Sequence, residues 1–277
     1  MTVTKLTVKN ENLTIRRVRR FFYGVFMKQA HFIVQGKGGV GKSLIASMLA
    51  QYLTDFSGSV ISCFDTDPVN PTFSRYQALN VETINILNEQ NDINKREFDT
   101  LVERLADDSV EIAVIDNGAA TFIPLMSYFM ENDLVSLLAE SGVGIIFHVP
   151  LYGGDALGDT LKGLSAILKR LSASVVVWLN HNQNKIVFDN VAHFTDTKIY
   201  KANAAQILGT VELKQRNAET FGVDIKEMTQ RHLTVAEVKA NADKRWKLTE
   251  IQRINLFYKD ICEQLHQIPL FAESTTE

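Results

Sequence analysis

Residues 34–43 of the chain are Val34-Gln35-Gly36-Lys37-Gly38-Gly39-Val40-Gly41-Lys42-Ser43. They fit the phosphate-binding loop pattern G-x-x-x-x-G-K-[ST], whose glycines let backbone N–H groups point inward around a polyphosphate. The pattern places Lys42 near the β- and γ-phosphates and the Ser43 hydroxyl on Mg²⁺. A short apolar run, residues 31–34, precedes the loop, and residues 43–53 follow it with the composition of an apolar helix. We therefore predict a polyphosphate site at a helix N-terminus, where unpaired N–H groups and the helix dipole favour anions.

Two further segments place carboxylates directly after apolar runs. Residues 60–64 are predicted to form a strand, and Asp65 and Asp67 follow it in the sequence Asp-Thr-Asp-Pro. Carboxylates at positions i and i+2 leaving a strand point the same way, as metal-associated and water-orienting groups must. Residues 111–115 form a second apolar run that ends at Asp116, the position of the acid that holds Mg²⁺ beside a phosphate loop. An Asp-Pro turn that merely closes a strand is the alternative explanation for the first segment.

Polar residues also end two later apolar runs. Residues 174–179 are predicted as a strand that ends at Asn180, a position that ordinary turn chemistry also explains. His148 ends a run that begins at Gly144, and a lone histidine at a strand end is more often structural than catalytic. We therefore do not place His148 in the catalytic set.

The whole chain alternates between predicted strands and predicted helices. Its 277 residues are 45% hydrophobic, which is enough for one full-sized core. A helix is predicted between residues 154 and 171, and apolar side chains at helical spacing predict another over residues 251–265. This alternation indicates an α/β fold with a mostly parallel sheet covered by helices on both faces, and ligands bind such folds at the carboxyl ends of the strands. The predicted strands are 31–35, 59–64, 111–115, 144–148, 174–179 and 206–211.

The loop contains a second lysine, Lys37, which is not needed to hold phosphate within one subunit. The form Lys-Gly-Gly-Val-Gly-Lys-Ser resembles the deviant Walker A loop of the ParA/MinD ATPase superfamily. The resemblance implies a single-domain P-loop NTPase of the SIMIBI type over residues 27–270, with ATP and Mg²⁺ as cofactors and a homodimer closed around two ATP molecules. By the same resemblance, Lys37 crosses to the partner's nucleotide and Asp67 positions the attacking water, so that these two are the implied catalytic residues.

The remaining implied site residues follow from the same family pattern. Asp65 would lie near the Mg²⁺ shell, Asp116 would hold the metal through water, and Asn180 would hydrogen-bond the adenine edge. The implied nucleotide-binding set is Gly36, Lys37, Gly38, Gly39, Val40, Gly41, Lys42, Ser43 and Asn180, and the implied metal set is Ser43, Asp65 and Asp116.

A narrower resemblance concerns the acid-bearing segments. Together with the loop, Asp65-Thr66-Asp67-Pro68-Val69-Asn70, Val114-Ile115-Asp116-Asn117-Gly118-Ala119 and Val177-Trp178-Leu179-Asn180 are similar to the TraL group, ParA-like ATPases encoded in the transfer regions of conjugative plasmids. The similarity covers about residues 27–265. Superfamily members usually have a small residue and proline after the second acid, whereas this chain has Asn117-Gly118, which leaves the detail of that segment open.

The resemblance implies an ATP hydrolase, slow without a partner, that supports conjugative plasmid DNA transfer or plasmid positioning with a transfer or partition protein. Two alternatives stay open. One is a chromosome or plasmid partition ATPase that works with a ParB-like partner. The other is a nucleotide-gated scaffold protein whose hydrolysis is negligible.

Charge and composition limit the other partners. Residues 1–30 hold seven basic groups and one acid, whereas the whole chain carries a net charge of −3, so the body is acidic and poorly suited to non-specific DNA binding. Two cysteines give neither a disulfide framework nor a metal set. The apolar stretch after Arg16-Arg17 is too short for an export signal, no run is long enough to span a membrane, and we expect a cytoplasmic protein without a stable membrane anchor.

Both ends are predicted to lie outside the domain. Residues 1–26 are a basic extension, either disordered or added by a mis-assigned start codon, and an arm for nucleic acid or anionic lipid is the functional alternative. Residues 271–277 are predicted to be a short acidic tail, which lacks the basic face of a membrane-binding helix.

Overall fold

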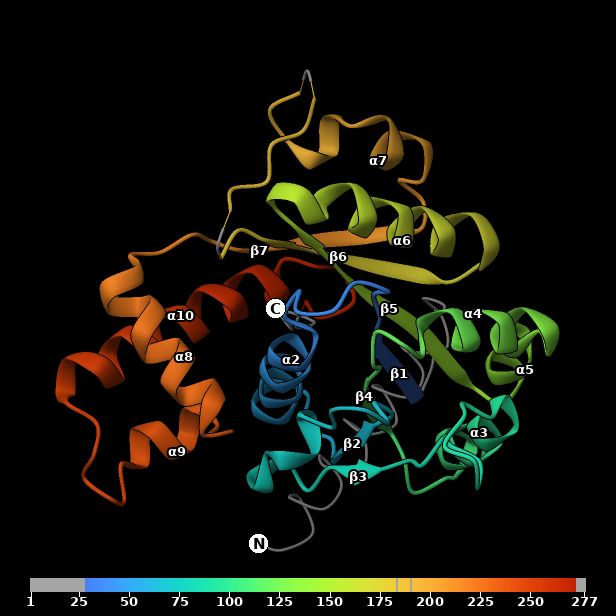
Figure 1. Ribbon diagram of the computed structural model, residues 1–277, viewed down its shortest axis with the longest axis horizontal. Helices are drawn as coiled ribbons and strands as arrows, with labels where there is room; N and C mark the ends of the chain where they lie inside the picture. Colours follow the sequence, from blue (N-terminus) through green and yellow to red (C-terminus); the bar gives the residue numbers. More distant parts are fainter. Residues whose placement is uncertain (1–27, 183, 190, 273–277) are drawn as a thin grey trace, which may run out of the picture.

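The computed structural model describes residues 28–272 except 183 and 190, so the predictions for residues 1–26 and 273–277 lie outside the described residues. The described chain contains a seven-stranded sheet in the order β3-β2-β4-β1-β5-β6-β7 (Figure 1). All its strand pairs are parallel, which confirms the predicted sheet. The strands are β1 (Lys28–Ile33), β2 (Ile61–Asp65), β3 (Glu82–Thr83), β4 (Ile112–Asp116), β5 (Val143–Tyr152), β6 (Ser174–Asn180) and β7 (Ile207–Leu213).

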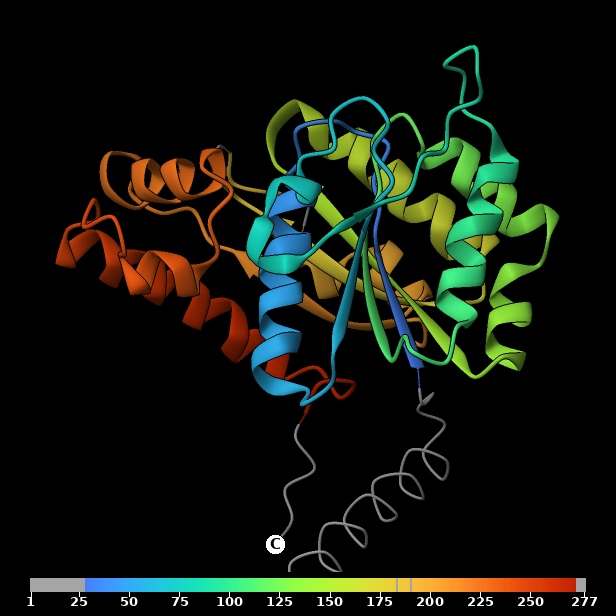
Figure 2. The ribbon, with the colours of Figure 1, turned by 90° about the horizontal axis from the view of Figure 1, so that it is seen from below.

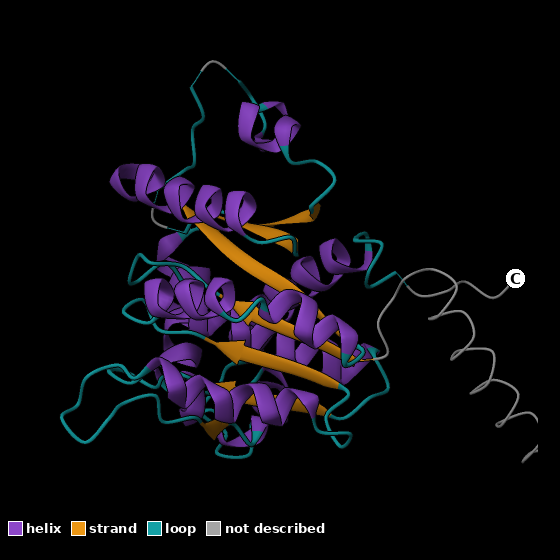
Figure 3. Cartoon of the chain, turned by 90° about the vertical axis from the view of Figure 1, so that its right-hand side faces the viewer, coloured by secondary structure: helices purple, strands orange, loops and turns teal. Residues whose placement is uncertain are grey.

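Helices cover both faces of this sheet, as predicted (Figures 2 and 3). One face packs against α3 (Phe98–Ala106), α4 (Phe122–Glu131), α5 (Leu134–Glu140) and α6 (Leu157–Arg170). The other packs against α2 (Lys42–Phe56), α8 (Val223–Gln230), α9 (Val235–Ala240) and α10 (Leu248–His266). A short helix, α7 (Lys198–Ala202), precedes β7, and single turns lie at Phe73–Arg75, Gln77–Leu79, Lys95–Glu97, Gly154–Ala156, Phe194–Asp196 and Ala218–Gly222.

Alternation along the strands divides the core into two layers. Phe32 of β1 belongs to the cluster under α3–α6, whereas its neighbour Ile33 belongs to the cluster under α2 and α10. This period of two is the expected consequence of a strand buried on both faces. It explains why the central strands are continuous apolar runs in the sequence.

Strand β5 is longer than predicted, because it continues past His148 through Pro150 to Tyr152. Its pairing with β1 ends at His148, while its pairing with β6 continues to Tyr152. Proline is tolerated here because it has no N–H to offer on the side where the neighbouring strand has ended. The Pro150 carbonyl instead accepts a hydrogen bond from Gln35 Nε2 at 3.0 Å.

A chain of buried side-chain hydrogen bonds crosses three strands in the second layer. Trp178 Nε1–H donates to His148 Nδ1 at 3.0 Å, because an indole nitrogen can only donate. His148 therefore carries its proton on Nε2 and donates to His31 Nδ1 at 3.0 Å, and His31 donates from Nε2 to Gln29 Oε1 at 3.2 Å. Both imidazoles are thus held neutral and in defined tautomers, which agrees with the structural interpretation of His148.

The phenyl ring of Phe271 covers this hydrogen-bonded chain. It stacks on His31 with 5.7 Å between ring centroids, and its edge meets Tyr52 of α2 at 5.7 Å. Phe271, which the sequence assigned to the tail, is therefore packed against the domain.

Helix α10 protects the outer edge of the sheet at β7. The Gln264 side chain accepts from the Glu212 N–H at 2.7 Å and donates to the Glu212 carbonyl at 3.0 Å, as a neighbouring strand would.

Within the described part of the chain, no helix is both long and apolar enough to cross a membrane.

Candidate functional site

The phosphate loop connects β1 to α2 at the carboxyl edge of the sheet. Gly39 and Gly41 have φ angles of 74° and 93°, in the left-handed region that other residues rarely adopt. Gly41 is the N-cap residue of α2, so the loop ends at the exposed amides of the helix N-terminus. The backbone geometry that an anion site requires is thus present.

Gln35, which the sequence analysis did not single out, anchors the start of this loop. Its side chain is buried and donates to the carbonyls of Pro150 and Thr160 at 3.0 and 3.1 Å, while its Oε1 accepts from the Gly36 N–H at 3.0 Å. A Cβ atom on Gly163 of α6 would lie 2.1 Å from Gln35 Oε1, so a glycine is needed there. The one sequence feature that could have indicated this role is the position of Gln35, a polar residue directly after the apolar run of residues 31–34.

Lys42 lies at the centre of the site with its side chain largely buried. Its ammonium donates to the Lys37 carbonyl at 3.3 Å. Burial lowers the pKa of Lys42, and the negative charges of Asp116 and Asp67 act in the opposite direction. The structure therefore brings the loop lysine and two of the predicted acids into one electrostatic neighbourhood.

Asp116, at the end of β4, is fully buried and fits a cation site. Burial raises its pKa to about 7, with Asp65 and Asp67 also raising it, while a hydrogen bond from Ser43 and the charge of Lys42 lower it. Among the described residues, its Oδ1 is one of the few buried side-chain atoms without a hydrogen-bond partner. An unpartnered carboxylate oxygen beside the Ser43 hydroxyl matches the hard oxygen ligands that Mg²⁺ prefers.

Asp65 and Asp67 hold the segment after β2 in its conformation. Asp65 is buried and accepts backbone N–H groups on both oxygens, from Asp67 at 3.0 Å and from Ser74 at 2.9 Å. Burial raises its pKa, against the effect of these hydrogen bonds. Asp67 Oδ1 accepts from the backbone N–H groups of Val69 and Asn70, each at 3.0 Å. Both carboxylates therefore act as local caps in this conformation, and their roles toward metal and water remain predictions.

The Lys37 side chain forms an ion pair with helix α6. Its ammonium lies 3.1 Å from Asp159 Oδ2, in the first turn of α6, and both side chains are about half exposed, at 45% and 51%. Lys37 and neighbouring Lys162 hold the pKa of Asp159 below its ordinary value. Because the pair is solvated, it constrains Lys37 only weakly.

Asn180 is hydrogen-bonded to the back of the loop. Its Nδ2 donates to the Val40 carbonyl at 3.0 Å, and its Oδ1 accepts from the Asn182 N–H at 3.0 Å. A Cβ atom on Gly41 would lie 2.9 Å from Asn180 Nδ2. The side chain thus supports the loop, and its predicted contact with adenine would use its remaining hydrogen-bonding positions.

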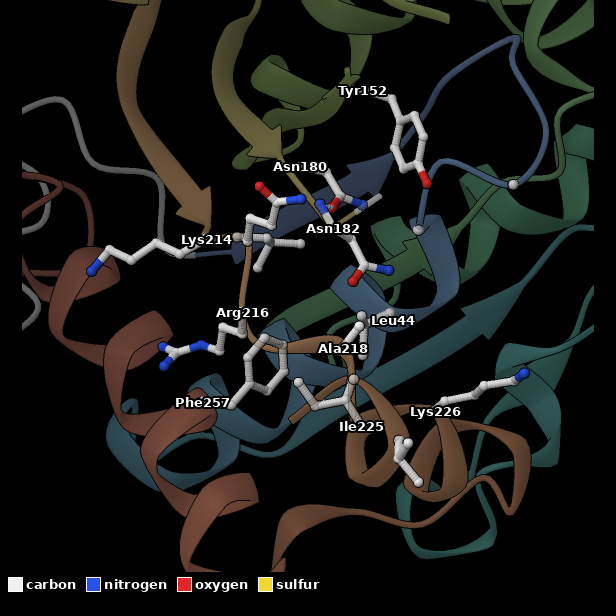
Figure 4. Close-up of a pocket in the computed structure, with 16 residues that line it drawn as sticks. Leu44, Tyr152, Asn180, Asn182, Lys214, Arg216, Ala218, Ile225, Lys226 and Phe257 are labelled. Atoms are coloured by element: carbon white, nitrogen blue, oxygen red, sulfur yellow. Dashed lines mark hydrogen bonds between the residues drawn. The ribbon is translucent and has the colours of Figure 1, made fainter. Parts of the chain in front are cut away.

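A pocket of about 580 Å³ opens beside the loop glycines (Figure 4). Apolar side chains from α2, β7, α8 and α10 form much of its wall, and Tyr152 and Asn182 contribute polar groups. Figure 4 shows Lys214 and Arg216 extending toward α10, where both bond to Asp260, at 2.6 and 2.9 Å. The pocket lining comprises Gly39, Gly41, Leu44, Tyr152, Asn180, Asn182, Leu213, Lys214, Gln215, Arg216, Ala218, Gly222, Val223, Ile225, Lys226 and Phe257.

The family follows from a match over most of this fold. Residues 31–262 match the family model described as "CobQ/CobB/MinD/ParA nucleotide binding domain". The chain belongs to this family. It is therefore a nucleotide-binding protein of the MinD/ParA type, in agreement with the resemblance seen in the sequence.

Two curated relatives align with this chain over 241 residues. Both are named "Protein TraL" and both come from Escherichia coli. They are 40% and 38% identical, and each alignment covers 86% of this chain and 98% of the relative. The predicted resemblance to the TraL group is confirmed. The similarity to the TraL group thus spans nearly the full length of these relatives.

The solved structures similar to this chain include a ParA family ATPase from Chlorobium tepidum TLS, with a TM-score of 0.46, 14% identity, and coverage of 84% of this chain and 98% of that one. The MinC:MinD cell division protein complex from Aquifex aeolicus gives a TM-score of 0.45 and 12% identity, with coverage of 84% and 94%.

Proposed function

We propose that this protein is a Mg²⁺-dependent ATPase that hydrolyses ATP slowly and dimerises around two ATP molecules. The observation that carries the proposal is the convergence of Lys42, Asp67 and the buried Asp116 on the phosphate loop. Family membership supports nucleotide binding, and the pocket beside Gly39 and Gly41 has room for a nucleoside.

Each residue of the site has a distinct part in this proposal. The loop amides and Lys42 bind the phosphates and neutralise charge that develops during phosphoryl transfer. Ser43 and Asp116 would hold Mg²⁺, with Asp65 nearby, and the ion would supply positive charge that neutralises the phosphates. Asp67 Oδ1 accepts from the Val69 and Asn70 amides, so its other oxygen, Oδ2, would orient the attacking water.

The dimer depends on Lys37. In the proposed ATP-bound state this lysine leaves Asp159 and reaches the nucleotide of the partner subunit. The low cost of breaking a half-exposed ion pair supports this exchange, because a desolvated contact with a phosphate is stronger than a solvated one with a carboxylate.

We place the protein in conjugative plasmid transfer or plasmid positioning, in the cytoplasm, with a transfer or partition protein as its partner. The similarity to two proteins named TraL supports transfer. A partition ATPase working with a ParB-like partner is the alternative within the same family, and DNA binding is not part of the proposal because the body is acidic.

Phosphate release tests the proposal. Wild type should release phosphate from Mg·ATP, and Asp67→Ala should retain ATP binding while losing most of this activity, with and without candidate transfer proteins. Asp196→Ala, at an exposed acid remote from the loop, is the matched control and should behave as wild type. Absence of hydrolysis by wild type under all conditions would favour the nucleotide-gated scaffold instead.

A further inference from the structure

Asn117, the residue after the second acid, joins the two acid-bearing segments through its side chain. Its amide oxygen accepts from the Thr66 hydroxyl at 3.0 Å, and Thr66 lies between Asp65 and Asp67. The backbone reinforces this link, because the Thr66 N–H donates to the Asp116 carbonyl at 2.9 Å, and the Thr66 hydroxyl shares its proton with the same carbonyl at 3.2 Å. Asn117 and Thr66 are both buried, so water does not compete for these bonds.

The other half of the Asn117 amide fixes the next peptide. Its Nδ2 donates to the Gly118 carbonyl at 3.1 Å, and the Thr121 hydroxyl donates to the same oxygen at 2.8 Å. One carboxamide thus uses its acceptor toward Thr66 and its donor toward Gly118. Aspartate lacks the donor and alanine lacks both groups, so neither common replacement would reproduce the link.

Gly118 in turn supports the water-orienting acid. A Cβ atom on Gly118 would lie 2.6 Å from Asp67 Cγ and 2.8 and 2.9 Å from its two carboxylate oxygens. A side chain at residue 118 would therefore have to displace the Asp67 carboxylate, which lies against the Gly118 backbone. Since the Gly118 peptide is held by Asn117, the position of Asp67 depends on Asn117.

We propose that Asn117 is a positioning residue for ATP hydrolysis: through Thr66 and Gly118 it sets the place of Asp67 relative to Asp116. Gly118 lacks a side chain because Asp67 occupies that space. This inference rests on the proposed function, since it assigns a role in the same reaction. It also accounts for the Asn117-Gly118 pair that departs from the sequence usual after the second acid.

The effect should fall on hydrolysis more than on binding. The phosphate-binding groups, Lys42 and the loop amides, make no side-chain hydrogen bond to Asn117 among the described residues. The Asn117 N–H bonds to the Ile33 carbonyl at 3.2 Å through the backbone, which a side-chain substitution retains. Displacement of Asp67 by a fraction of an ångström should disturb the alignment of the attacking water far more than its longer-range charge interaction with Lys42.

The first test compares substitutions at both ends of the link. Asn117→Ala and Thr66→Val should lower kcat for phosphate release about 10- to 100-fold while the Kd for ATP stays within about twofold. Thr66→Ser keeps the hydroxyl and should restore most of the rate. Gln51→Leu removes another buried carboxamide that bonds in both directions, to Ser47 and Val235, and should lower the melting temperature without lowering kcat.

The second test is a double-mutant cycle with Asp67. If Asn117 acts through Asp67, the Asn117→Ala/Asp67→Ala protein should be no slower than Asp67→Ala alone, and Gly118→Ala should show the same non-additivity. Additive losses, or equal losses of kcat and ATP affinity, would overturn the positioning role. A wild-type protein that hydrolyses no ATP would overturn the proposed function itself, so the two failures are distinguishable.

Discussion

Acid should destabilise this protein through the buried imidazole of His31 at pH values where most carboxylates stay ionised. Burial lowers the pKa of His31 from 6.5 to about 3, and burial together with His31 also lowers the pKa of His148. Between pH 6.5 and about pH 3, His31 binds a proton in the unfolded chain but not in the folded chain. Stability therefore falls as the pH drops below 6.5 and is lost progressively down to about 3.

The size of this effect follows from the pKa difference. One pKa unit corresponds to about 1.4 kcal/mol, so His31 alone should cost about 2 kcal/mol of unfolding free energy at pH 5. That is a large share of the stability of a typical domain, roughly 5–15 kcal/mol. Asp116 acts in the opposite direction, because its raised pKa of about 7 lets the folded state gain a proton first as the pH falls. A comparison between variants is therefore needed to isolate the histidine.

Denaturant unfolding of wild type and His31→Gln between pH 5 and 7 provides this comparison. The difference in unfolding free energy should change by about 1.4 kcal/mol per pH unit near pH 5–6, wild type losing more on acidification. His193→Gln, at an exposed histidine, is the control and should follow the wild-type curve. Parallel curves for wild type and His31→Gln would refute the reasoning, since they would mean that His31 binds its proton equally in both states.

Lys42→Ala should abolish ATP binding, because it removes the charge that faces the β- and γ-phosphates; unchanged affinity in isothermal titration would overturn the loop assignment. Lys37→Ala should bind ATP but remain monomeric, losing about 2–5 kcal/mol of dimer stability, and light scattering with a non-hydrolysable analogue measures this. Asp159→Asn removes the half-exposed ion pair that holds Lys37 in its own subunit, so it should raise the dimerisation constant only a few-fold. Removal of residues 1–26 should leave the melting temperature and ATP affinity unchanged, because the first strand begins at Lys28; a large drop in either would show that this segment packs on the domain.

Local patterns were sufficient to predict most of the fold. The strand, loop and helix around Gly36–Ser43 are contiguous in sequence, and parallel strands buried on both faces appear as apolar runs. The two-residue strand β3 was missed because so short a segment has no periodicity, and it forms by pairing with β2. The end of β5 was placed too early because the polar side chain of His148 ends the apolar run, although the strand continues through Pro150 to Tyr152 by pairing with β6.

The site was less predictable where distant segments meet. The acids could be named because each ends or closely follows a strand, but the bonds of Gln35 to Pro150 and Thr160 depend on contacts more than 100 residues apart. The partners of Asn180 were likewise hidden, since nothing local shows that Val40 lies against it. The apolar wall of the pocket, which includes Leu213, Ile225 and Phe257, carries no sequence motif. Apolar contacts constrain the shape and volume of the side chains rather than their identity.

The attachment of residues 212–216 to α10 has a consequence for synthesis of the protein. The phosphate loop leaves the ribosome early, but Phe257, Asp260 and Gln264, which complete or brace the far wall of the pocket, follow more than 200 residues later. Domains fold as units during synthesis. A nascent chain can thus carry an intact loop yet lack the enclosure that would retain a nucleoside. If this pocket holds the nucleoside, as the proposed function requires, ribosome-stalled chains ending before residue 257 should fail to retain fluorescent ATP analogues.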